Sequence, residues 1–252
     1  MPPKETTWAG QNPSALRRIK SKLQTWKRIY HARQFNSIVV ISKVDLKKWE
    51  RYTRKAVCIY NPITITNSKI SARTAKCVIS VGRLDFQKGY DYLINAWQHV
   101  ALKHNDWHLN IYGEGNLRDK LKSQIDGLGL SDSITLYGRT SRIEEEYANH
   151  SIFVMSSRAE GFPLALLEAS SCGLPLVSFD CPSGPSEIIE DGRNGFLIEK
   201  VGDIQTMAEK ICSLIEDEIL RHKMGEKAYE LVLKFSIDKI REQWDKLICG
   251  ML

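Results

Sequence analysis

The sequence predicts an α/β protein built on a doubly wound parallel sheet. From Cys77 onward, short apolar runs alternate with longer segments of helical periodicity, the pattern of repeated β-α units. Runs such as Cys77–Val81 and Ile152–Met155 contain almost no polar residue, which is typical of strands buried on both faces. The 252 residues are 42% hydrophobic, enough for a sizeable packed core.

The first 60 residues carry most of the positive charge. They contain 14 lysines and arginines against three acidic residues, a net charge of +11, whereas the remainder has a net charge of −5. In Ser14–Arg33 apolar residues recur at helical spacing among the basic ones, which predicts a basic amphipathic helix. Such a helix can pack on the body of a domain, contact an anionic membrane or bind nucleic acid. No aromatic stacking platform favours nucleic acid, and we expect none as a partner.

A short β-rich unit follows this helix. Ser37–Ser42 and Ala56–Tyr60 are apolar runs that flank a helical segment at Val44–Tyr52, and Asn61-Pro62 ends the pattern. Residues 62–75 are polar and are expected to form a linker.

The expected elements of the main domain can be read in order from the same alternation. The expected strands lie at 77–81, 107–112, 133–137, 152–155, 175–179 and 195–198. The expected helices lie at 90–103, 116–127, 142–149, 164–172, 184–190, 204–215, 218–233 and 237–248.

The segment Glu160-Gly-Phe-Pro-Leu-Ala-Leu-Leu-Glu168 places two carboxylates across an expected loop-to-helix junction. Gly161 allows a ligand to approach the backbone closely, and Pro163 suits the first helical position. The free N–H groups of the first helical turn form a site for an anion. Together with two carboxylate acceptors, this site suits a ligand that carries phosphates and hydroxyls, such as a nucleotide sugar. The alternative is an ordinary loop with a solvated Glu168.

Two cations follow the first strand of the main domain. Arg83 and Lys88 are expected at the carboxyl edge of the sheet, where open α/β sheets bind ligands, and together they could neutralise a diphosphate. The alternative is that Lys88 is a surface lysine and that Arg83 belongs to a surface ion pair.

We expect neither a metal nor another cofactor. The chain contains no Asp-x-Asp, and its six cysteines are scattered without a Cys-x-x-Cys pair, so we expect reduced thiols. His104 and His108 are four residues apart, but they flank a turn and are not expected to bind a metal. Arg83, Lys88 and the open helix end are expected to supply the positive charge instead. The sequence shows no signal peptide or membrane-spanning stretch, which favours a cytoplasmic protein.

The segment EGFPLALLEASSCGLPLVSFDCPSGPSEII, residues 160–189, closely resembles the donor-binding signature of family 4 retaining glycosyltransferases, which have the GT-B fold. Val81-Gly-Arg-Leu-Asp-Phe-Gln-Lys-Gly89 and Tyr112-Gly-Glu-Gly115 resemble further elements of that family, and the resemblance covers roughly residues 35–250. It implies two Rossmann-like domains, of which the first binds the acceptor and the second binds a nucleotide sugar.

The resemblance also implies roles for individual residues. Arg83 and Lys88 would hold the donor phosphates, Glu160 would contact a hydroxyl of the transferred sugar, and Glu168 would accept hydrogen bonds from the ribose. Ser183–Glu187 is expected to be structural. The expected catalytic residues are Arg83, Lys88 and Glu160, and the expected donor-binding residues are Gly82, Arg139 near the base, the backbone of Gly161, Phe162, Pro163 and Leu164, and Glu168.

The resemblance implies a particular division of the chain. Residues 1–61 would be the end of an acceptor domain, 62–75 a linker, 76–233 the donor domain and 234–252 a helix that packs back toward the N-terminal segment. The implied activity is metal-independent transfer of a sugar from a UDP- or GDP-sugar to a glycan or lipid-linked acceptor, in surface polysaccharide synthesis at the inner face of the cytoplasmic membrane.

Three alternatives to this activity remain. The first is a truncated or split-enzyme module that binds a nucleotide sugar and needs a complementing N-terminal half. The second is a nucleic-acid binder that works through residues 1–60. The third is a glycosidase that uses Glu160 and Glu168, against which the expected phosphate site argues.

Overall fold

The computed structural model describes residues 15–65 and 69–250, with side chains from residue 23 onward. Ser14, the first residue of the predicted basic helix, therefore lies outside the described residues. The chain divides into two compact units, residues 1–60 and residues 61–252.

The first unit is a small β-α-β arrangement preceded by a long helix. Helix α1 (Ala15–Ala32) is followed by strand β1 (Ile38–Val40), helix α2 (Lys43–Glu50) and strand β2 (Ala56–Cys58). The two strands pair in parallel, with Ile38 opposite Ala56. Helix α2 begins after Ser42, whose hydroxyl accepts a hydrogen bond from the Asp45 N–H at 3.1 Å. A serine at this position satisfies one of the free N–H groups of the first turn, which explains where the helix starts.

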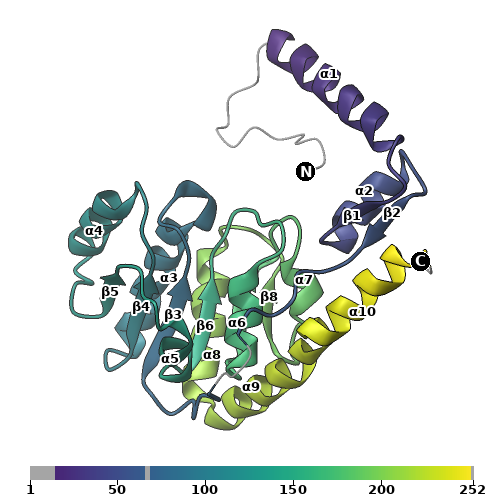
Figure 1. The fold of residues 1–252 in the computed structure, drawn as a ribbon. Helices are drawn as coiled ribbons and strands as arrows, with labels where there is room; N and C mark the ends of the chain where they lie inside the picture. The colour runs from purple at the N-terminus through teal and green to yellow at the C-terminus, as the bar shows by residue number, and fades with distance from the viewer. Residues whose placement is uncertain (1–14, 66–68, 251–252) are drawn as a thin grey trace. The chain divides into compact units, whose positions relative to one another are not determined.

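The second unit is built on a six-stranded parallel sheet in the order β5-β4-β3-β6-β7-β8 (Figure 1). All five strand pairs are parallel. The predicted doubly wound α/β fold is therefore confirmed. The strands are β3 (Cys77–Val81), β4 (His108–Tyr112), β5 (Ile134–Tyr137), β6 (Ile152–Met155), β7 (Leu176–Phe179) and β8 (Gly195–Ile198).

Helices cover both faces of this sheet (Figure 1). On one face α3 packs against α4 and α8, and on the other α6 packs against α5. Asp203 and Asp217 cap the starts of α8 and α9 through bonds to the N–H groups of Thr206 and Leu220. The helices are α3 (Tyr90–Lys103), α4 (Arg118–Gly127), α5 (Ile143–Ala148), α6 (Leu164–Ser171), α7 (Pro185–Ile188), α8 (Ile204–Glu216), α9 (Glu218–Val232) and α10 (Ile237–Ile248), with 3-10 turns η1 (Phe86–Lys88) and η2 (Leu233–Phe235).

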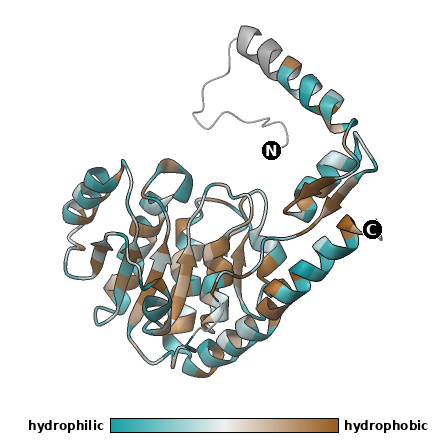
Figure 2. Cartoon of the chain, viewed as in Figure 1, coloured by the Kyte–Doolittle hydropathy of each residue, from teal (hydrophilic) through white to brown (hydrophobic). Residues whose placement is uncertain are grey.

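The core lies between the sheet and its helices, and the apolar residues concentrate on the strands (Figure 2). Trp97 of α3 is fully buried, and its indole N–H donates to the Ser133 hydroxyl at 3.3 Å. The bond satisfies the one polar group that this large side chain takes out of water.

The segment predicted as a linker, residues 62–75, contains no helix or strand in its described part, but it belongs to the second unit and is packed within it. Ile63 and Ile65 are buried, and the Ile63 N–H donates to the Phe235 carbonyl at 2.9 Å. Arg73 is also buried and donates to the Gly173 carbonyl at 2.9 Å. These contacts were not predicted because the segment as a whole is polar. The predicted packing of the C-terminal helix toward the N-terminal segment stays a prediction.

Candidate functional site

The sheet has one switch point, between the neighbouring strands β3 and β6. From β3 the chain continues to β4 and β5, whereas from β6 it continues in the opposite direction to β7 and β8. Loops that leave the carboxyl ends of two such strands diverge and leave a crevice that ligands commonly occupy. The loop after β3 carries Gly82, Arg83 and Lys88, and the loop after β6 leads to Glu160.

Lys88 and Glu160 meet at this switch point. The Lys88 ammonium lies 2.8 Å from Glu160 Oε1, and the two side chains are only 18% and 8% exposed. The Ser157 hydroxyl donates to the same carboxylate oxygen at 2.6 Å. Two residues that the sequence predicted in one site are therefore in direct contact, in a place largely shielded from water. Ser157 was not predicted, and a serine next to a strand end carries no signal that distinguishes it.

The conformation of the η1 turn places Lys88 at the switch point. Asp85 caps the η1 turn by accepting the Lys88 N–H at 3.1 Å, and Gly89 ends the turn in the left-handed region with φ 65°. A Cβ atom on Gly89 would lie 2.2 Å from the Ser156 carbonyl oxygen, so only glycine fits. At Gly82 a Cβ atom would lie 3.0 Å from Lys88 Cε. Gly82 thus contributes by leaving room for the lysine side chain.

Arg83 and Arg139 are not part of this contact. The Arg83 guanidinium lies 3.1 Å from Asp85 Oδ2 with a side chain that is 71% exposed. The Arg139 side chain is 81% exposed, and its Nε lies 3.3 Å from Glu114 Oε2. Exposed ion pairs of this kind contribute little energy, so both arginines are free to exchange their partners for a ligand. The structure shows the surface ion pair that was the alternative for Arg83.

The start of α6 agrees with the expected helix at 164–172, but the expected position of Pro163 within the helix does not. Pro163 has φ −79° and ψ 96° and is the N-cap residue, so the helix begins at Leu164. The prediction that Pro163 takes the first helical position was therefore wrong by one residue. The Leu166 N–H already bonds the Pro163 carbonyl at 3.1 Å, because the extended Pro163 turns its carbonyl toward the helix. The amides of Leu164 and Ala165 remain in the first turn, where an α-helix provides no partner.

Phe162 and Pro163 are buried, whereas Gly161 and Leu164 are exposed. The Phe162 ring packs on the ring of Phe235, with centroids 5.5 Å apart. A Cβ atom on Gly184 would lie 2.4 Å from Pro163 Cδ, so Gly184, the N-cap residue of α7, packs closely against this turn. The side chains of Phe162 and Pro163 are therefore occupied by packing, and the predicted contact of their backbone with a ligand stays a prediction.

Glu168 lies in the second turn of α6 and is held from two sides. Its Oε2 accepts the Tyr147 hydroxyl and its Oε1 accepts the Thr64 hydroxyl, both at 3.1 Å. Tyr147 is fully buried, and burial, followed by the nearby Glu168 carboxylate, raises the pKa of Tyr147. The phenol therefore stays protonated and donates. Neither Tyr147 nor Thr64 was predicted, since a tyrosine on an amphipathic helix usually belongs to the core.

No group of three or more potential metal-binding side chains lies at Lys88 and Glu160 within the described residues. The one such group in that part of the chain is His104, Cys212 and Glu216, at the far end of α3. His108 is not a member of it. The expectation that the switch-point site works without a metal stays a prediction.

The fold and the switch-point site define this protein as a Rossmann-like α/β domain with a cation, two carboxylates and a helix start gathered at the carboxyl edge of its sheet. The model of the family described as glycosyl transferases group 1 matches residues 64–231. The chain belongs to this family of glycosyltransferases.

Relatives support the assignment over most of the chain. An uncharacterized glycosyltransferase of Haemophilus influenzae is 33% identical over 216 residues, which are 84% of this chain and 61% of that protein. A poly(ribitol-phosphate) alpha-N-acetylglucosaminyltransferase of Staphylococcus aureus is 32% identical over 221 residues, 86% of this chain and 44% of that protein.

Solved structures show the same fold. A mutant of S. aureus TarM, crystallised with fondaparinux, alpha-GlcNAc-glycerol and UDP, superposes with a TM-score of 0.82 at 32% identity. The match covers 90% of this chain and 46% of that chain. The pneumococcal O-GlcNAc transferase GtfA with UDP and GlcNAc gives a TM-score of 0.79 at 28% identity. The expected GT-B-like fold is confirmed. This chain spans between 44% and 61% of the length of these relatives.

Proposed function

We propose that this chain transfers a hexose from a UDP- or GDP-sugar to a glycan or lipid-linked glycan, and that it needs no metal ion to do so. The observation that carries the proposal is the Lys88–Glu160 contact at the switch point, 2.8 Å long and largely shielded from water. It is supported by Glu168 on the helix that starts beside this contact. The relatives add to this support, since one is named as an N-acetylglucosaminyltransferase and two were solved with UDP.

The proposed roles follow from the charge that develops in the reaction. Breaking the bond between the sugar and the diphosphate leaves negative charge on the departing diphosphate. Lys88, Arg83 and the amides at the start of α6 would stabilise that charge more strongly in the transition state than in the ground state. Glu160 would hold the sugar, Glu168 the ribose and Arg139 the region of the base. Retention at the sugar carbon is proposed from the resemblance to family 4.

A thermal-shift panel tests the proposal. UDP, GDP, ADP and their sugars are compared in buffer that contains a chelator, because a ligand that binds only the folded chain raises its melting temperature. We expect one nucleoside diphosphate to raise the melting temperature under these conditions. If none does so with the chelator, while one does so after magnesium or manganese is added, metal independence is refuted. If none does so in either buffer, the proposed donor site is refuted.

A second candidate function is a nucleotide-sugar-binding module that needs another chain for activity. One observation favours it: the relative GtfA was also solved in a GtfA/B complex. Release of free nucleoside diphosphate from a UDP- or GDP-sugar by the purified chain alone would exclude this module. Binding without turnover would favour it.

Replacing Tyr147 by phenylalanine should weaken binding of the preferred nucleoside diphosphate two- to tenfold. The change removes one hydrogen bond to Glu168, a contribution of about 0.5–1.5 kcal/mol, and preserves the buried ring. Calorimetry with the nucleotide and its 2′,3′-dideoxy analogue measures the effect. The analogue should bind both proteins equally, since it lacks the hydroxyls from which Glu168 would accept hydrogen bonds.

Tyr229→Phe, in an exposed tyrosine of α9, is the matched control for Tyr147→Phe. Equal losses for both ligands would refute the ribose role of Glu168.

We also propose that α1 contacts an anionic membrane. Leu23, Trp26 and Tyr30 are 58%, 67% and 53% exposed, and Lys27 and Arg28 beside them are exposed too. No helix in the described parts of the chain has the length and apolar character to span a bilayer. Trp26→Ala should reduce sedimentation with phosphatidylserine vesicles, with phosphatidylcholine vesicles as the control. An unchanged sedimented fraction would exclude this contact.

A further inference from the structure

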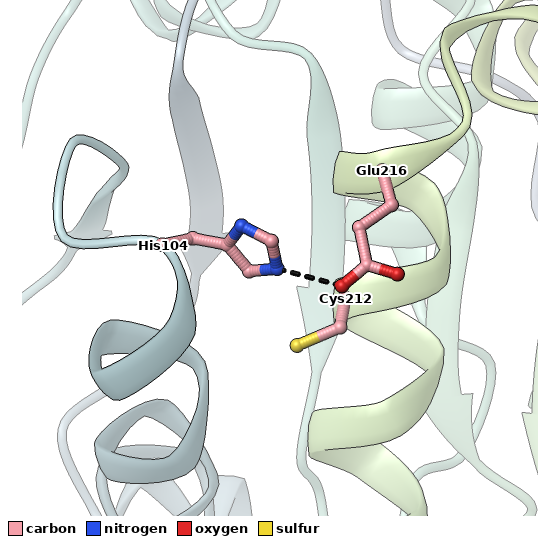
Figure 3. Close-up of side chains that lie close together, drawn as sticks. All are labelled: His104, Cys212 and Glu216. Carbon is pink, nitrogen blue, oxygen red and sulfur yellow. Dashed lines mark hydrogen bonds and ion pairs between the residues drawn. The ribbon is translucent and has the colours of Figure 1, made fainter.

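Three side chains with different donor atoms converge at the end of α3 that lies away from the switch-point site. His104 is the C-cap residue of α3, and Cys212 and Glu216 lie one turn apart on α8. Figure 3 shows the His104 ring pointing from the end of α3 toward the two side chains on the facing helix. The His104 Nε2 atom lies 2.9 Å from Glu216 Oε1, and the nitrogen, sulfur and oxygen atoms of the three residues all lie within 4.8 Å of one another.

We propose that His104, Cys212 and Glu216 bind one Zn²⁺ ion, which joins the end of α3 to α8. This site is separate from the proposed donor site, whose Lys88 lies at the opposite end of α3.

The donor set selects the class of metal. Imidazole nitrogen, thiolate sulfur and carboxylate oxygen are the three ligand types that Zn²⁺ accepts in proteins. Magnesium and calcium prefer oxygen ligands only, so a site with one sulfur and one nitrogen donor disfavours them. Three protein ligands leave the fourth position of a tetrahedral ion to water.

The spacing is close to that of a tetrahedral zinc site. With metal–ligand bonds of roughly 2.0–2.3 Å, the ligand atoms of such a site lie roughly 3.3–3.7 Å apart. The present separations, from 2.9 Å between His104 and Glu216 to at most 4.8 Å, bracket that range. Glu216 is 57% exposed and can rotate to adjust the distances, whereas Cys212 is buried at 5% exposure and fixed.

The helix ends add to the attraction for a cation. His104 follows the last residue of α3, and Glu216 is the last residue of α8, so the negative ends of two helix dipoles face this point.

Two backbone hydrogen bonds fix the position of His104. The His104 N–H bonds the Val100 carbonyl, and the Trp107 N–H bonds the His104 carbonyl at 3.1 Å. The imidazole therefore starts from a backbone that is fixed on both sides.

Cobalt substitution tests the proposal, because a cobalt–thiolate bond gives a charge-transfer absorption that a free thiol lacks. The full chain is stripped with a chelator, titrated with Co²⁺ and then with competing Zn²⁺. We expect one Co²⁺ per chain, the charge-transfer absorption, its loss on adding Zn²⁺, and a higher melting temperature with Zn²⁺. Cys212→Ser should abolish the absorption, and His104→Gln and Glu216→Gln should each weaken binding at least about tenfold.

Two variants serve as controls for these changes. Cys249→Ser removes an exposed cysteine outside the cluster, and Glu209→Gln removes an exposed carboxylate two turns earlier on α8, so both should bind Co²⁺ as the parent does. Absence of the absorption in the folded parent chain would overturn the proposal. So would an absorption that persists in Cys212→Ser or disappears in Cys249→Ser. If Cys212→Ser does not fold, His104→Gln decides the question, and unchanged affinity there refutes the site.

Discussion

Replacing Lys88 by alanine is expected to weaken binding of the preferred nucleoside diphosphate about 10- to 100-fold. The estimate follows from one charge-assisted contact of about 1.5–3 kcal/mol in a place shielded from water. The loss for the corresponding monophosphate should be smaller, because the monophosphate lacks the distal phosphate that Lys88 would contact. Isothermal titration calorimetry with both nucleotides, in the presence of a chelator, measures the difference.

Arg83 is expected to contribute less to nucleotide affinity than Lys88. Arg83→Ala removes a side chain that is 71% exposed and paired with Asp85, so we expect a smaller loss of affinity than for Lys88→Ala. Lys120→Ala, in an exposed lysine of α4, is the control for a general effect of charge. Circular dichroism must show that Lys88→Ala is folded, since the change leaves Glu160 without its cation. Unchanged affinity, or the same loss for monophosphate and diphosphate, would remove Lys88 from the phosphate site.

The second large effect is expected at Gly113, where β4 ends. Its φ is 144°, and a Cβ atom there would lie 1.9 Å from the backbone oxygen of Gly82. The ends of β3 and β4 would have to separate to admit it, so Gly113→Ala should cost more than about 4 kcal/mol of unfolding free energy or prevent folding. Gly129→Ala is the matched control, since Gly129 also has a positive φ, 68°, but a Cβ atom there meets nothing within 4 Å.

Urea unfolding of the two alanine variants separates the cost of the steric clash from the cost of a positive φ. Gly129→Ala should cost only about 1–2 kcal/mol, the usual penalty for a left-handed alanine. A loss at Gly113 no greater than the loss at Gly129 would show that the turn accommodates a side chain. The expected difference would show that the turn after β4 packs closely against the loop that carries Lys88. Gly82 takes part in two close approaches: a Cβ atom on Gly113 would meet the Gly82 backbone oxygen, and a Cβ atom on Gly82 would meet the Lys88 side chain.

Much of the fold could be predicted from the sequence because its signals are local. The strands Cys77–Val81 and Ile152–Met155 were predicted to the residue, as was helix Tyr90–Lys103. The Pro163 error was of the same local kind and amounted to one residue, because a proline is compatible with both the N-cap and the first helical position. The packing of Ile63 and Ile65 was missed because two apolar residues in a polar segment give no periodic signal.

The candidate site was predicted in part. Lys88, Glu160 and Glu168 were singled out from their motifs, and the structure brings the first two together. Ser157, Tyr147 and Thr64 were missed, since their role depends only on what lies opposite them. Arg83 and Arg139 were predicted beside the site, but the structure places both guanidinium groups on nearby carboxylates at the surface.

The order of the elements, their approximate bounds and the residue types available for the site could be read from the sequence, because periodicity, caps and turns depend on neighbours along the chain. Which of these residues touch became clear only from the three-dimensional fold. Lys88 and Glu160 are 72 positions apart, and Thr64 and Glu168 are 104 apart. They meet because β3 and β6 are neighbours in the sheet and because residues 61–65 pack on the domain. Contacts across such separations follow from strand order and packing, which no local pattern encodes.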